Sequence, residues 1–160
     1  MPEVSEDPQT TPLKEHWTPE GPWMDEADKH HALWRDEHTG LLCFACRNWM
    51  GVWCGYVVLE KHSPLWKEHN MSPSVCSLKV HGGVNYCNYI SIPEELLSTV
   101  ETFEDTSLPE EERLWGLGFD CSHWGDGIPL SLIKRKGTYR NLEYISNEIR
   151  RLARQVYLLL

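Results

Sequence analysis

The sequence has no apolar run that could cross a membrane, which takes about 20 residues, and it has few bases. Its 160 residues include 15 Lys and Arg against 24 Asp and Glu, a net charge of −9. Proteins that bind nucleic acid polymers usually present a basic surface, so this balance argues against such a partner. The N-terminal residues are acidic and lack the apolar core of a signal peptide. We therefore expect a cytoplasmic protein with no membrane partner.

The ligand pattern of a structural zinc site is incomplete. Cys43 and Cys46 have C-x-x-C spacing and Cys54 follows, but no second C-x-x-C or H-x-x-x-H pair completes a set of four ligands. In a strand, Cys43 and Cys46 would also point to opposite faces. The βαβ context of a thioredoxin-type redox pair is absent as well. Because the protein is expected to be cytoplasmic, the six cysteines are expected to be reduced thiols and not a disulfide framework.

Length and composition are typical of one domain with a single core. Residues 1–22 are acidic and rich in proline and are predicted to form an irregular tail, and residues 23–160 a single domain. Stretches rich in aromatic and β-branched residues predict strands at 39–48, 51–60, 77–83, 84–92 and 113–123. Helices are predicted at 24–36, 93–103 and 138–156. The expected fold is α+β, an antiparallel sheet of about four to six strands with a long C-terminal helix packed on one face.

The last helix has the clearest pattern. Apolar residues recur every three or four positions, as one face of a helix requires: Leu142, Ile145, Ile149, Leu152 and Val156. Thr138 is predicted as its N-cap. The final three leucines are costly to leave in water. We expect them to pack on the sheet or on a second subunit of a homo-oligomer.

The strand at 113–123 leads into a segment with several chemically active side chains. Strand alternation places Phe119 and Cys121 toward the core and Gly118 and Asp120 on the other face. Glycine in a strand often marks a close approach by another group. The face of Gly116 and Gly118 is therefore expected to be open to a ligand or a backbone segment, which would meet the carboxylate of Asp120.

Further candidates follow where this strand ends. There His123 and Asp126 can turn toward Asp120, and the three are candidate catalytic residues. The structural alternative is that Asp126, which precedes Gly127, only caps a turn. Trp124 offers a flat ring on which a ligand could stack.

A second group of candidates is the V-H-G-G sequence, predicted at the end of a strand. Gly82 and Gly83 allow the backbone to approach a ligand closely, and His81 can serve as a general base or a metal ligand. A tight turn with a partly exposed histidine is the alternative. His62 is either a third imidazole of the same cleft or a loop residue. Arg140, at the start of the last helix, could bind a phosphate together with the helix amides.

A divalent metal ion is a further hypothesis. Two histidines and two carboxylates suit Zn²⁺, Mn²⁺ or Fe²⁺, and the set would be His81, Asp120, His123 and Asp126. The hypothesis requires these side chains to meet. Groups more than about 12 Å apart could not share one small-ligand pocket.

Four segments, in this order, are the basis for a resemblance: CGYVVLEKHSPLW, VHGGVNY, GLGFDCSHWGD and YRNLEYISNEIRRLARQV. Over about residues 42–157 they resemble a group of small tailed-phage and prophage proteins with V-H-G-G and G-F-D-C-x-H-x-G-D motifs. The chain departs from that pattern at Ser63, which separates His62 from Pro64, and at Asn85, which replaces Thr. The resemblance implies no particular activity. It carries over the matching residues His81, Asp120, Cys121, His123, Gly125 and Asp126.

A small phage accessory protein in the host cell cytosol is suited to counter a host defence signal, often a small nucleotide. The first hypothesis is a hydrolase that cleaves a phosphodiester-type bond, with His81 or His123 as general base and acid, Asp120 orienting an imidazole and Asp126 assisting. The second is a protein that sequesters the nucleotide without chemistry, and the third is an acidic protein–protein inhibitor. Three acid and imidazole groups within seven positions favour the enzyme, because carboxylates repel phosphate.

Overall fold

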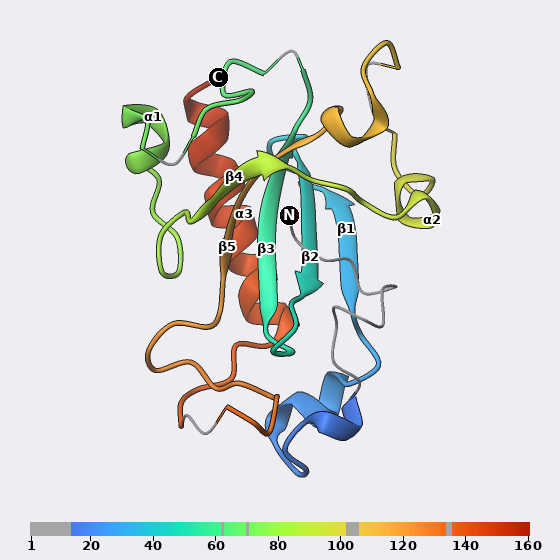
Figure 1. The fold of residues 1–160 in the computed structure, drawn as a ribbon. Helices are drawn as coiled ribbons and strands as arrows, with labels where there is room; N and C mark the ends of the chain where they lie inside the picture. Colours follow the sequence, from blue (N-terminus) through green and yellow to red (C-terminus); the bar gives the residue numbers. More distant parts are fainter. Residues whose placement is uncertain (1–13, 62, 70, 102–105, 134–135) are drawn as a thin grey trace.

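The computed structural model describes residues 14–61, 63–69, 71–101, 106–133 and 136–160. A five-stranded antiparallel sheet has the order β1-β2-β3-β5-β4, and the long helix α3 crosses one face (Figure 1). The predicted α+β class is confirmed. The main elements are β1 (His31–Arg35), β2 (Leu42–Arg47), β3 (Trp53–Leu59), β4 (Tyr86–Tyr89), β5 (Trp115–Asp120) and α3 (Leu142–Leu158). The short helices are η1 (Lys14–His16), η2 (Pro22–Glu26), α1 (Pro73–Cys76), α2 (Glu94–Leu97) and η3 (Glu110–Glu112).

Three predicted elements differ from the structure. The helix predicted at 24–36 is wrong, because that segment contains the end of η2 and the edge strand β1, which pairs with Leu42 to Cys46 of β2. The strand at 77–83 is also wrong. Its backbone amides at Lys79 and His81 donate to side chains of α3 instead of to a neighbouring strand. The helix predicted at 93–103 is too long. Within the described part of that segment, only the four residues of α2 are helical.

The predicted apolar face of α3 is confirmed. Ile145, Ile149, Leu152 and Val156 are fully buried, and the helix packs against β2 and β3. Gly55 of β3 permits this close packing, since a Cβ there would lie 2.6 Å from Cγ1 of Ile149. The N-cap is Asn141 and not Thr138, because Oδ1 of Asn141 accepts a hydrogen bond of 2.8 Å from the Tyr144 amide. The last three leucines are exposed in the monomer and do not pack on the sheet.

The face of the sheet opposite α3 is closed by side chains. β5 alternates as predicted, with Leu117, Phe119 and Cys121 in the core beneath α3. The glycine face, however, is not open to a ligand. A Cβ at Gly118 would lie 2.2 Å from the ring of Tyr56, and one at Gly116 would meet Tyr56 and Ile90. The glycines therefore make room for the protein's own side chains.

The N-terminal end of α3 is anchored by a buried ion pair. The Arg47 side chain is fully buried, and its Nη2 lies 4.0 Å from Oε1 of Glu26. Its guanidinium carbon lies 4.7 and 4.4 Å from the rings of Trp17 and Trp53. The same Glu26 oxygen accepts hydrogen bonds from Nε1 of Trp53 (2.9 Å) and from the first amide of α3, at Leu142 (3.0 Å).

The described part of the predicted tail packs on the domain. Trp17 is buried, and Thr18 donates a 2.8 Å backbone hydrogen bond to Pro129. Residues 1–13 lie outside the described residues. Within the described ranges, no helix has the length and apolar character needed to span a bilayer.

Candidate functional site

The centre of the candidate site is a hydrogen bond between His81 and Asp126. Nε2 of His81 lies 2.8 Å from Oδ2 of Asp126, and Nδ1 of His81 lies 2.8 Å from the Tyr144 hydroxyl. The other carboxylate oxygen, Oδ1, accepts from Nε of Arg140 at 2.9 Å. The amide of His123 also donates to Oδ2, at 3.0 Å. Asp126 is thus a buried carboxylate with several donors, as a buried charge requires.

The protonation state of Asp126 follows from these contacts. Burial acts to raise the pKa of Asp126, but the hydrogen bonds from His81 and Arg140 outweigh it, and the pKa lies below its ordinary value. The same contact with Asp126 raises the pKa of Arg140. Asp126 is therefore an ionised acceptor near neutral pH, which suits a residue that holds its neighbours in place better than one that exchanges protons.

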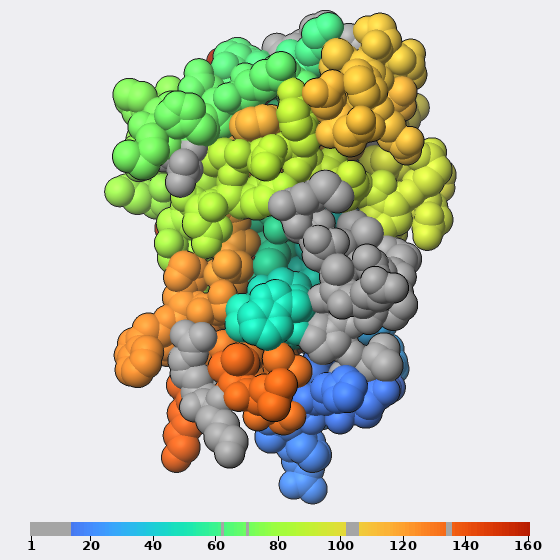
Figure 2. All heavy atoms as spheres, viewed as in Figure 1, coloured from blue at the N-terminus to red at the C-terminus, as the bar shows by residue number. Residues whose placement is uncertain are grey.

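Three segments far apart in the sequence bring this centre together. His81 lies in a turn closed by a hydrogen bond from Gly83 to Val80, with positive φ angles of 70° and 82° at Gly82 and Gly83. Residues 121–127 follow β5, and their backbone pairs with Thr138 just before α3. On the surface the segments around residues 80–90 (yellow-green) and 120–130 (orange) meet (Figure 2).

A second histidine–carboxylate pair lies beside the first. Nε2 of His123 is 3.2 Å from Oδ1 of Asp120 and is buried without a hydrogen bond from any described residue. The His123 side chain as a whole is 36% exposed. Asp120 is held by the hydroxyl of Ser122 at 2.9 Å and by the Asn85 amide at 3.3 Å. The side chains of this dyad (His123 and Asp120) are 36% and 28% exposed, against 13% and 2% for His81 and Asp126.

The two histidines are close neighbours. Their ring centroids are 5.8 Å apart, with planes inclined at 64°, well inside the separation that one ligand site allows. Gly82 makes this possible, because a Cβ there would lie 2.1 Å from Nε2 of His123. The four predicted catalytic residues therefore form one cluster of two pairs.

The other predicted residues have different surroundings. Trp124 is 92% exposed beside His123. A Cβ at Gly83 would meet nothing within 4 Å, so that glycine faces open space. Arg140 binds Asp126 and stacks on Tyr144, with its guanidinium carbon 4.9 Å from the ring centre. Cys121 is buried, and burial raises the pKa of its thiol. His62 lies outside the described residues.

Two residues that contact His81, Tyr144 and Glu148, were not predicted. Tyr144 contacts His81, and Oε1 of Glu148 accepts a 2.9 Å hydrogen bond from the His81 amide. They are four residues apart and therefore share one face of α3. That spacing was a signal in the sequence, but nothing local showed that this face meets the V-H-G-G turn.

Among the described residues, no group of three or more His, Cys, Asp or Glu side chains is placed to hold a metal ion. In the predicted metal-binding set, Nε2 of His81 and Oδ2 of Asp126 are hydrogen-bonded to each other, so these atoms are not directed at a common metal position. Cys43 and Cys46 point to opposite faces of β2, as predicted, and lie in different core clusters. The C-x-x-C spacing therefore reflects core packing.

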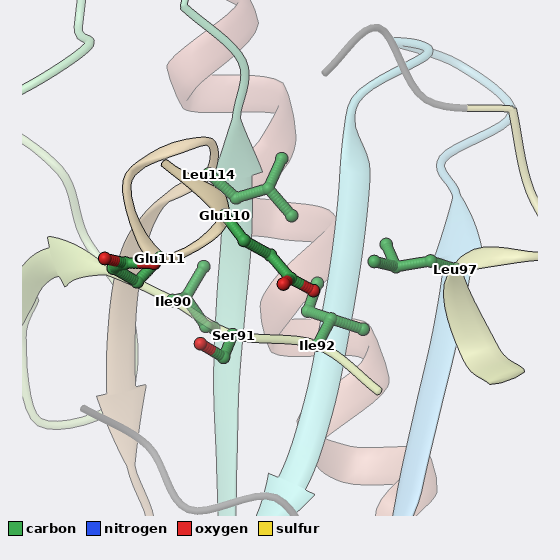
Figure 3. A pocket seen from close by; sticks show the side chains of 7 residues that line it. All are labelled: Ile90, Ser91, Ile92, Leu97, Glu110, Glu111 and Leu114. Atoms are coloured by element: carbon green, nitrogen blue, oxygen red, sulfur yellow. The ribbon is translucent and has the colours of Figure 1, made fainter. Parts of the chain in front are cut away.

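A separate cavity lies on the face of the sheet away from α3, and Figure 3 shows it. Its volume is about 190 Å³, and Glu110 and Glu111 are among the residues that line it. These carboxylates make it unsuited to a phosphate. It includes none of the predicted site residues, since its other lining residues are Ile90, Ser91, Ile92, Leu97 and Leu114.

No protein-family model matches the chain, and no curated protein or solved structure matches it. Membership in the phage group therefore stays a prediction from the motifs. Any assignment of function depends on the geometry of the two histidine–carboxylate pairs.

Proposed function

We propose that the protein hydrolyses a phosphodiester-type bond in a small nucleotide signal, with His123 as the group that moves the proton. The observation that carries this is the dyad of His123 and Asp120, with 3.2 Å between Nε2 and Oδ1 and a partly exposed ring. A carboxylate beside an imidazole can hold the ring in a fixed orientation. An imidazole that is so oriented and partly exposed is suited to act as a general base and acid.

In this proposal the two pairs have different tasks. Because Nε2 of His123 is buried beside Asp120, we assign the proton transfer to Nδ1, which takes a proton from water as the water oxygen bonds to phosphorus. The bond from phosphorus to the leaving oxygen then breaks, and that oxygen takes a proton from His123. His81 and Asp126 are positioning residues, because both ring nitrogens of His81 are hydrogen-bonded and Asp126 is buried. Asp126 holds the backbone of His123 in place.

The nucleotide part of the proposal has two supports. The exposed ring of Trp124 lies next to His123 and offers a stacking surface for a base. The resemblance to small phage proteins favours a counter-defence role in the host cell cytosol. Within that role, a nucleotide messenger is a ligand on which a protein of this size can act.

Sequestration without chemistry is the second candidate. His81 is hydrogen-bonded to Tyr144 and Asp126, so only His123 is left for acid–base catalysis. This favours binding without chemistry. In that case the exposed parts of the same surface bind the intact nucleotide. The acidic protein–protein inhibitor is the third candidate, with the exposed glutamates of η3 as part of its surface.

One experiment separates these candidates. The protein is incubated with a panel of cyclic and ADP-ribose-type nucleotides, heated to release ligand, and the nucleotides are analysed by HPLC. Altered nucleotides indicate an enzyme, whereas intact nucleotides recovered only after heating indicate sequestration. If no nucleotide is altered or depleted, both proposals are wrong and the inhibitor remains.

The role of His123 has its own test. His123→Ala is expected to lower turnover by about 10²–10⁴-fold, the usual contribution of general acid–base catalysis. The matched control is His38→Ala, which removes an exposed histidine of the β1–β2 connection and should leave turnover unchanged. Turnover of His123→Ala equal to that of the unchanged protein would remove His123 from the mechanism.

A further inference from the structure

A cationic hollow borders the V-H-G-G turn, of which Val80 and Gly83 line it. Its volume is about 490 Å³, which falls within the usual range for small-ligand pockets, about 300–1,000 Å³. Lys79 and Arg151 supply its charge. Its apolar wall is formed by Val75, Leu78, Val80 and Val84. We refer to it as the Lys79 hollow.

The Lys79 hollow and the dyad share one short stretch of backbone. Gly83 and Val84 line the hollow. The residues on either side of them contact the dyad, because Gly82 packs against the His123 ring and Asn85 donates to Asp120. Consecutive Cα atoms are about 3.8 Å apart, so the four residues span at most about 11 Å. A ligand held in the hollow is therefore within one small molecule's reach of the dyad.

The backbone of Lys79 is held by side chains of α3, along which the chain from α1 to β4 runs (Figure 1). Gln155 both accepts from the Lys79 amide and donates to its carbonyl, each at 2.7 Å. Nη2 of Arg151 donates to the same carbonyl at 3.1 Å, and Nη1 lies 3.3 Å from Glu148. These bonds use the backbone of Lys79. Within the described residues its ammonium group has no ion pair.

The charge around the Lys79 hollow differs from that of the whole protein. A second hollow of about 540 Å³ adjoins it through Lys79 and Arg151 and adds Arg150 and Arg154. Of the described residues, none with an acidic side chain lines either hollow, and the carboxylate of Glu148 lies close by, where it pairs with Arg151. In a chain of net charge −9, such a concentration of positive charge in a concave surface attracts anions selectively.

We propose that the Lys79 hollow binds a phosphate group of the ligand other than the one at which His123 acts, with Lys79 and Arg151 contacting the phosphate oxygens and the valine and leucine wall contacting an apolar part of the ligand. This inference rests on the proposed function, since it names the phosphate subsite for the ligand on which the dyad acts. The chemical class is a phosphorylated small molecule with a hydrophobic portion, as a nucleotide is.

The test measures binding without turnover. Inorganic pyrophosphate is titrated into the full chain by calorimetry, at low and at moderate salt. Saturable binding that weakens as salt increases is expected. Lys79→Ala, which removes no described side-chain hydrogen bond, and the double variant Lys79→Ala/Arg151→Ala should weaken it by at least about tenfold, the effect of one charged contact. The control Lys29→Ala/Lys136→Ala removes two exposed cations elsewhere and should leave it unchanged.

A second measurement does not depend on these variants. Cys76 is exposed and lines the Lys79 hollow, so saturating pyrophosphate should slow its alkylation by iodoacetamide, as followed by peptide mass spectrometry. Equal binding by the hollow variant and the control variant, no saturable binding, or unprotected Cys76 would each overturn the inference. His123→Ala should bind pyrophosphate normally. If the unchanged protein binds pyrophosphate but turns over no nucleotide, the proposed chemistry is rejected and the phosphate subsite still stands.

Discussion

The substitution Asp126→Asn tests whether Asp126 is the structural centre of the site. The carboxylate accepts from Arg140 through Oδ1, and its Oδ2 is bound by His81 and the His123 amide. An amide has one acceptor oxygen, so its NH₂ group must face either Arg140 or the His123 amide, both of which are donors. At least one charged hydrogen bond is lost in either orientation.

The expected loss can be worked out from these contacts. A hydrogen bond to a charged group contributes about 1.5–3 kcal/mol, and a buried donor left without its partner adds to the cost. Arg140 is partly exposed, which limits that addition. We expect Asp126→Asn to lower the free energy of unfolding by about 2–4 kcal/mol at pH 7. For a domain of this size the melting temperature should fall by roughly 4–16 °C.

The loss should depend on pH with a definite sign. The pKa of Asp126 is lower in the folded protein than its ordinary value, so its contribution to stability is present above about pH 3.9, the usual unfolded value. That contribution is lost as the pH falls through the folded value. The gap between Asp126→Asn and the unchanged protein should therefore be full at pH 7 and shrink below pH 4.

Urea unfolding, followed by tryptophan fluorescence between pH 7 and pH 3, measures this gap. The control is Asp28→Asn, which removes a fully exposed carboxylate paired with Lys14 and should not shift the urea midpoint at pH 7. Equal midpoints for Asp126→Asn and the unchanged protein at pH 7, or a gap that stays constant down to pH 3, would refute the reasoning.

Three further predictions concern the framework of the site. Arg47→Ala should lower the free energy of unfolding by about 3–5 kcal/mol, because the carboxylate of its partner stays buried without the guanidinium, and a loss below about 1 kcal/mol in urea unfolding would contradict this. Asn141→Ala should cost about 1 kcal/mol in the same assay through loss of the α3 cap, and Thr138→Ala should cost less. In the native protein iodoacetamide should modify Cys76 first, and much slower reaction is expected at the buried thiols whose pKa values burial raises, which are Cys43, Cys54 and Cys121. Equal rates in peptide mass spectrometry would contradict that last prediction.

The periodicity of apolar residues was sufficient to predict those helices and strands whose buried face is visible in their own sequence. The apolar spacing from Ile145 to Val156 requires a helix with one buried face, whatever that face packs against. Alternation likewise assigned Phe119 and Cys121 to the core. The strands predicted at 39–48 and 51–60 were visible as two strand-forming runs, and the structure pairs them as β2 and β3.

Elements that depend on a distant partner were predicted wrongly. β1 is a strand because it completes its hydrogen bonds on β2, and this pairing overrides a helical tendency in its residues. Residues 77–83 are not a strand, because side chains of α3 take up their amides at Lys79 and His81. The glycines of β5 suggested open space, yet Tyr56, from the neighbouring strand, fills it.

For the site, the sequence by itself determined which chemical groups are available and that three of them lie at the end of one strand. Only the tertiary structure decided which imidazole meets which carboxylate. His81 binds Asp126, 45 residues away, while His123 faces Asp120, three residues before it. The physical reason is that alternation along a strand is local, whereas this pairing requires the V-H-G-G turn to dock against both the segment after β5 and the first turns of α3. That docking leaves His123 accessible and makes Asp126 the centre that positions it.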